Sequence, residues 1–100
     1  MPIGRRGPGK EGKVQDKTAN QKMTGLMSFL VSQVYTLAGR SVVDVVYEDK
    51  DAGKRINQEV NMCLLKVLRQ YPAAIDSPSL AFSVMANDLD RIAETIRRNQ

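Results

Sequence analysis

Apolar residues recur about every 3.5 positions after residue 22, and this spacing constrains the fold more than any other feature of the chain. Steps of this size are typical of an amphipathic helix. Thr18, followed three residues later by Gln21, has the form of a capping box at a helix start. The pattern predicts one long helix that runs to about Glu48, with other helices packed on more than one side. Its spaced apolar positions are Met23, Met27, Leu30, Val34, Leu37 and Val45.

The segment YEDKDAG interrupts this pattern, because Asp and Gly favour turns. Asn57 is then placed to cap a second helix of about 13 residues, which Pro72 ends. Its apolar residues keep the i, i+3, i+4 spacing: Val60, Cys63, Leu64, Val67, Leu68 and Tyr71.

A third helix is predicted from Pro78 to about Arg98. Ser77 can cap it, and Pro78 occupies the first helical position, where its missing N–H costs nothing. Its apolar residues are spaced 3, 4, 3, 4, which predicts a narrow stripe that either faces a partner helix or packs within one bundle. We expect this stripe to be a partner interface, formed by Phe82, Met85, Leu89, Ile92 and Ile96.

The chain of 100 residues is long enough for one domain, and it contains five aromatic residues and no Trp. A core of Leu, Val, Ile, Met and Ala favours packed helices. We therefore predict an all-α protein, in which a disordered or extended N-terminal arm precedes a three-helix, long-short-long body. The expected division is an arm over residues 1–22 and a helical domain over residues 23–100.

The net charge of +4 belongs entirely to residues 1–22, which we call the basic arm. The arm has six cations and two anions, whereas residues 23–100 have nine of each. Its Gly and Pro content predicts no stable helix. Three roles remain open: a nucleic-acid-binding arm, a passive solubilising tail, and an extension that threads between subunits of an assembly. The candidate phosphate-binding residues are Arg5, Arg6, Lys10, Lys13, Lys17 and Lys22.

Catalysis is not expected. The sequence has no His, the commonest general base and metal ligand, and its single Cys63 lies among apolar residues. The segment GRRGPGKEGK lacks the spacing of a phosphate-binding loop. We therefore predict no enzyme activity, no cofactor and no metal. The apolar runs are too short for a membrane span or a signal peptide, so we expect an intracellular location (nucleus, nucleoid or virion) and no membrane partner.

Two stretches resemble the core histones and their archaeal and viral relatives. LMSFLVSQVYTLAGRSVVDVV followed by DAGKRINQEVNMCLLKVL is similar to a histone's long central helix, basic loop and short last helix. LLKVLRQYPAAIDSPSLAFSVMANDLDRIAETIRR is similar to the short first helix, loop and central helix. The resemblance implies a histone-like body with an obligate partner or homodimer. It also implies phosphate contacts at a pairing loop, made by Lys54 and Arg55. A histone fold is short-long-short, and this chain departs from that order.

Two functions follow from these observations. The first is a small, histone-like protein that binds nucleic acid through its arm and dimerises through its helices. The second is a structural or adaptor subunit, such as a minor virion component, that docks on protein through its arm and third helix. A sequence-specific regulator would need base-reading side chains on an exposed helix. Asn57, Gln58 and Asn61 cluster at one helix start, but capping explains Asn57 more simply.

Overall fold

The computed structural model describes residues 10–98, with side chains from Ala19 onward, and these residues form helices and turns without a strand. The all-α prediction is therefore confirmed for this part of the chain. The body has four α-helices where three were expected. The elements are α1 (Lys10–Ala38), α2 (Val42–Glu48), α3 (Ala52–Gln70), the short 3₁₀ helix η1 (Pro72–Asp76) and α4 (Pro78–Arg98).

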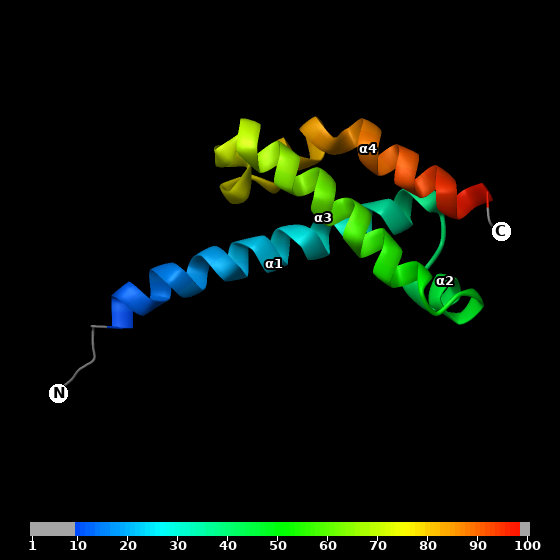
Figure 1. The fold of residues 1–100 in the computed structure, drawn as a ribbon, viewed down its shortest axis with the longest axis horizontal. Helices are drawn as coiled ribbons and strands as arrows, with labels where there is room; N and C mark the ends of the chain where they lie inside the picture. The colour runs from blue at the N-terminus through cyan, green and yellow to red at the C-terminus, as the bar shows by residue number, and fades with distance from the viewer. Residues whose placement is uncertain (1–9, 99–100) are drawn as a thin grey trace.

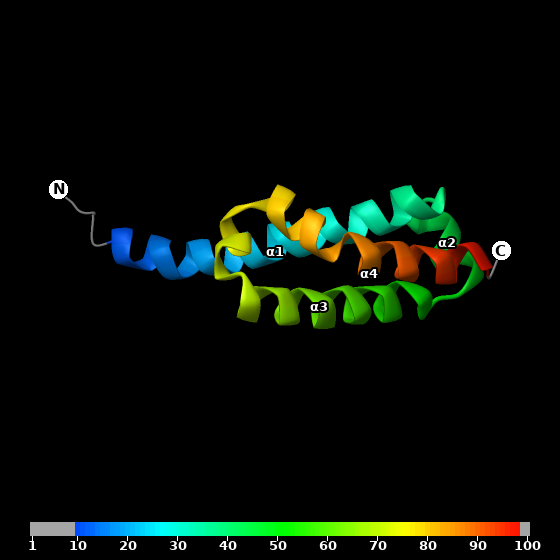
Figure 2. The same cartoon turned by 90° about the horizontal axis from the view of Figure 1, so that it is seen from above.

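The three long helices form a bundle in which α4 packs against both α1 and α3 (Figures 1 and 2). The apolar face of each long helix turns inward. α2 packs mainly on α3, at one end of the bundle. Seven large side chains are almost completely buried at the centre: Leu30, Val34, Val60, Leu64, Met85, Leu89 and Ile92.

Helix α1 begins at Lys10 and so extends into the arm, whose composition predicts no stable helix. The reason lies in where the helix breakers sit. Both prolines of the arm and three of its four glycines precede Lys10. From Lys10 to Lys22 only Gly12 is a helix breaker, and eight of the thirteen residues are Lys, Gln, Glu or Ala, which are good helix formers. The first turns of α1 extend beyond the other helices (Figure 1). Residues 1–9 lie outside the described part of the chain.

The expected helix from Met23 to Glu48 is broken at Gly39. Gly39 has φ of +70°, a left-handed conformation in which glycine is favoured. Its N–H donates to the Thr36 carbonyl at 3.1 Å, and the Arg40 N–H donates to the Tyr35 carbonyl at 3.2 Å. These two bonds form a Schellman motif, which ends a helix. The chain then turns by 77° into α2.

Side-chain caps start α2 and α4. The Ser41 hydroxyl accepts a hydrogen bond from the Asp44 N–H at 3.1 Å, and the Ser77 hydroxyl accepts one from the Leu80 N–H at 3.2 Å. Each bond satisfies a backbone donor that a helix start leaves unpaired. The prediction that Ser77 caps a last helix that begins with Pro78 is confirmed.

Helix α3 begins at Ala52, five residues before the predicted cap at Asn57, and it has 19 residues instead of about 13. The turn ends sooner than expected because the Asp49 carboxylate accepts a hydrogen bond from the Asp51 N–H at 3.0 Å. The Arg55 N–H then donates to the Asp51 carbonyl at 3.1 Å. Asn57 therefore lies inside the helix and caps nothing.

Replacing Gly39 with Ala should destabilise the fold by about 1 kcal/mol, because Ala is strained in the left-handed conformation. Gly25→Ala is the matched control. Gly25 lies on the exposed side of α1, and no atom lies within 4 Å of the place that an alanine methyl group would occupy, so alanine there should stabilise the helix by roughly 0.5–1 kcal/mol. Urea denaturation measures both changes. Equal effects of the same sign would contradict the break at Gly39.

Candidate functional site

The structure describes only some of the predicted phosphate-binding residues in full. Arg5 and Arg6 lie outside the described residues, and Lys10, Lys13 and Lys17 belong to α1 at positions whose side chains are not described.

The other three candidates differ in their surroundings. Lys22 forms an ion pair with Asp76, which ties α1 to η1. Arg55 pairs with Asp49 at 2.7 Å. Lys54 is exposed and makes no ion pair with any residue the structure describes. Of the two predicted loop cations, Lys54 alone is thus available to a ligand without breaking an existing pair, and both lie in the first turns of α3 instead of in a loop.

The apolar stripe of α4, predicted as a partner interface, is buried within this chain. Met85 and Leu89 are completely buried, and Ile92 and Ile96 are at most 7% exposed. Phe82 is half-buried, and its ring meets that of Phe29 of α1 edge-on, with 6.3 Å between the ring centroids. These residues pack against α1 and α3, so the stripe forms the bundle core, the alternative that the sequence also allowed.

Leu89→Ala should therefore lower the free energy of unfolding by about 2–5 kcal/mol, the range for emptying a buried leucine site. Val43→Ala is the control, since Val43 is 75% exposed and its truncation should change stability by less than about 0.5 kcal/mol. Denaturation at two protein concentrations separates core from interface. If the cost of Leu89→Ala disappears on dilution, the stripe serves an association between chains.

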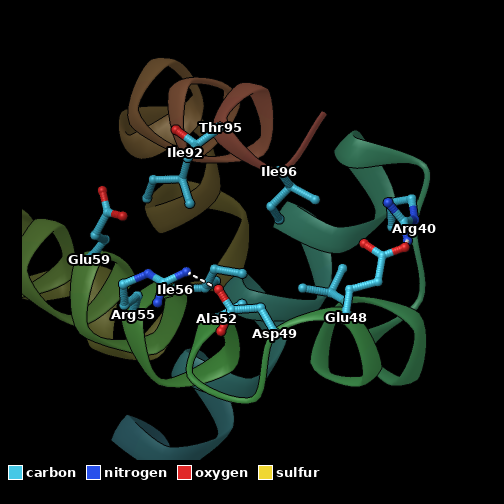
Figure 3. Close-up of a pocket in the computed structure, with 11 residues that line it drawn as sticks. Arg40, Glu48, Asp49, Ala52, Arg55, Ile56, Glu59, Ile92, Thr95 and Ile96 are labelled. Atoms are coloured by element: carbon cyan, nitrogen blue, oxygen red, sulfur yellow. Dashed lines mark hydrogen bonds and ion pairs between the residues drawn. The ribbon is translucent and has the colours of Figure 1, made fainter. Parts of the chain in front are cut away.

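A cavity of about 160 Å³ opens between α2, α3 and the end of α4 (Figure 3). Its apolar floor includes Ile56, Ile92 and Ile96. Charged side chains line its rim in pairs: Arg40 with Glu48 at 2.8 Å, and Arg55 with Asp49 at 2.7 Å.

Two of the groups at this rim, Asp49 and Arg55, are held in their charged forms. The hydrogen bond from Arg55 lowers the pKa of the Asp49 carboxyl, and the same bond raises the pKa of Arg55. A general acid or base works best with a pKa near the operating pH. These shifts move the pKa values of both groups further from neutral pH. The Asp49–Arg55 pair therefore braces the α2–α3 turn.

Cys63 is the one free thiol among the described residues. Burial raises its pKa, so at neutral pH the thiol stays protonated, and a protonated thiol is a poor nucleophile. Within residues 10–98, no group of three or more His, Cys, Asp or Glu side chains is arranged to hold a metal ion.

Asp49→Asn should lower the melting temperature at pH 7, because asparagine keeps the oxygen that accepts the Asp51 N–H but loses the charge that pairs with Arg55. The folded-state pKa of Asp49 lies below its unfolded value. Its stabilising effect is therefore complete above about pH 4 and is lost as pH falls through the folded pKa. Melting curves from pH 7 to pH 2 should show the wild-type advantage shrinking below about pH 4. A difference that is independent of pH would contradict this ion pair.

The structure also exposes surfaces that the sequence analysis missed. α2 presents Val43 and Tyr47, which are 75% and 90% exposed. The outer face of α3 carries Met62 and Leu65, 64% and 43% exposed, together with several cations. A shallow groove of about 510 Å³ runs along α1 past Tyr35, and Val42 at the start of α2 and Asn57 of α3 also line it. The sequence could have indicated the α3 face, since Met62 and Leu65 fall outside the spacing of the buried residues of α3.

No single helix within the described residues is long and apolar enough to cross a membrane; the bent pair Ala19–Ala38 and Val42–Glu48 passes such a test of length and composition together. Comparison with protein-family models, with curated proteins and with solved structures finds no match to this chain. The histone resemblance thus stays a prediction.

Proposed function

We propose that this chain is a non-enzymatic protein that binds nucleic acid by neutralising phosphates, first with its basic arm and then with exposed cations of its helical body. The observation that carries the proposal is the separation of charge. The arm holds the whole net charge of +4, while residues 23–100 are balanced. Cations placed on a nucleic-acid backbone release condensed counterions, which gives affinity without sequence selectivity. Such a role fits a location in a nucleus, nucleoid or virion.

The fold supports this proposal in two ways. The first turns of α1, which include Lys10, Lys13 and Lys17, project beyond the bundle (Figure 2), so a long polyanion could reach this segment without colliding with the other helices. In addition, ion pairs within the body occupy most of its acidic side chains. Asp44 and Asp51 are the acids without an ion pair to another described residue, against four such cations: Lys50, Lys54, Lys66 and Arg69.

A salt titration of binding to a random-sequence DNA duplex tests the proposal. The full chain should lose affinity steeply with salt, with a slope of about 0.9 in log K per phosphate contact. A full-length variant with Arg5, Arg6, Lys10, Lys13 and Lys17 changed to Gln should bind far more weakly and with a shallower slope. Lys22 is left intact because it pairs with Asp76.

Lys50→Gln is the control in this titration, since Lys50 is a surface cation in the turn between α2 and α3. It should change affinity by no more than one lost contact. If the wild-type chain fails to bind any duplex at low salt, the proposal is wrong.

The second candidate function is a structural or adaptor subunit that docks on protein. The observation that favours it is the exposure of three apolar side chains on the seven-residue α2, because exposed apolar clusters mark interaction surfaces. These are Val42, Val43 and Tyr47, which are 50%, 75% and 90% exposed. Binding of this kind would depend little on salt, which separates it from the first candidate in the same titration.

A further inference from the structure

We infer that the outer face of α3 enters the major groove of B-form DNA and reads base edges there; this rests on the proposed function and assigns it a second, sequence-reading surface. The inference starts from Asn57, Gln58 and Asn61. Capping accounted for Asn57 as long as a helix was expected to start there. Because α3 starts at Ala52, all three amides lie within the helix, and capping no longer explains Asn57. Asn57 itself lines the groove beside α1, which leaves Gln58 and Asn61 for the outer face.

The spacing of residues along α3 arranges its outer face in two adjacent rows. Spacings of 4, 3 and 4 place one row along the helix, since residues three and four apart are neighbours on a helix surface. We call this row the amide row: Lys54, Gln58, Asn61 and Leu65. Lys54 and Gln58 are exposed, Leu65 is 43% exposed and Asn61 is half-buried.

The second row lies beside the first, and we call it the cationic row: Arg55, Met62, Lys66 and Arg69. All four side chains are exposed. Lys66 and Arg69 make no ion pair with another described residue, and Arg55 is held by Asp49 at 2.7 Å. The one acidic residue of α3, Glu59, lies at the edge of this row and pairs with Arg91 of α4 at 3.7 Å.

This composition matches DNA better than a protein or a membrane surface. Asn and Gln can form paired hydrogen bonds with adenine, and an apolar side chain such as Leu65 can contact the methyl group of thymine. Cations along one flank can meet the phosphates of one strand. A membrane-binding helix would instead need a broad apolar face, and the apolar face of α3 is buried in the bundle.

The shape of α3 also fits. The major groove of B-form DNA is about 12 Å wide, and an α-helix with its side chains is about 10–12 Å across. α3 lies at the side of the bundle with its outer face uncovered by any other described helix (Figure 2). The major groove of an RNA duplex is too narrow for side chains to read, so the inference predicts a preference for DNA.

The first experiment selects bound sequences from a library of DNA duplexes with a randomised 20-base-pair centre, using the full chain. The wild-type protein should enrich a short motif that contains adenine, with a roughly 5- to 150-fold preference over a mismatched site for each amide contact. The double variant Gln58→Ala/Asn61→Ala should lose the enrichment and keep the salt slope. Asn87→Ala, which removes an exposed amide from α4, should change neither.

The second experiment separates phosphate contacts from base reading. Lys66→Ala/Arg69→Ala should reduce the salt slope on a DNA duplex by about 2, since each phosphate contact contributes about 0.9. On an RNA duplex of the same sequence the slope should be unchanged by this variant. Circular dichroism melts check that each variant remains folded, and a conservative Lys66→Arg/Arg69→Lys variant should restore the slope.

Three results would overturn the inference while leaving the proposed function intact: no enriched motif, enrichment that survives Gln58→Ala/Asn61→Ala, or a slope on RNA that falls as much as on DNA. A fourth is equal loss of binding to a polyglutamate peptide and to DNA in the Lys66→Ala/Arg69→Ala variant, which would make α3 a docking site for acidic protein. Failure of the wild-type chain to bind any duplex would instead remove the proposed function itself.

Discussion

The burial of the α4 apolar face between α1 and α3 is the interaction on which the rest of this structure depends. Met85 and Leu89 are completely buried, and burying a side chain of this size contributes about 1.5–3 kcal/mol. Fully buried Ala81 and Ala93 let the neighbouring helices come close. At the far end, Arg97 donates a hydrogen bond to the Leu37 carbonyl at 2.8 Å, which fixes the end of α4 against the end of α1.

This packing determines which charged side chains remain without an ion pair within the described part of the chain. The cations near the end of α4 face acids on the same helix, as Arg97 and Arg98 do with Glu94. The hydrogen bond from Arg97 lowers the pKa of Glu94, so the pair stays charged at neutral pH. α4 therefore presents a balanced surface. Residues 23–100 contain equal numbers of acidic and basic side chains, but the ion pairs among them are distributed unevenly over the helices.

Apolar spacing was enough to predict the helical fold from sequence. The start of α4 was predicted from Ser77 and Pro78, because a cap and a first-turn proline act locally. The break at Gly39 could not be predicted in the same way, since apolar residues continue on both sides of it and only the backbone conformation reveals the turn. The start of α1 within the arm was missed because the composition of the arm was averaged over 22 residues while its prolines lie at one end. Spacing alone also could not decide whether the α4 stripe faces its own chain or another, which depends on where α1 and α3 lie.

The same reasoning shows why α3 is the helix suited to a polyanion. From Met23 to Ala38, α1 carries no charged residue, so this part of α1 offers phosphates no cation. α4 pairs its cations with acids, and α2 exposes Val43 and Tyr47 beside Asp44. On α3, by contrast, the acid Glu59 is turned to Arg91 of α4, while Lys54, Lys66 and Arg69 point to solvent. Because Glu59 pairs with Arg91 of α4, the one acid of α3 does not neutralise the cations of α3. The outer face of α3 is therefore a surface complementary to phosphate.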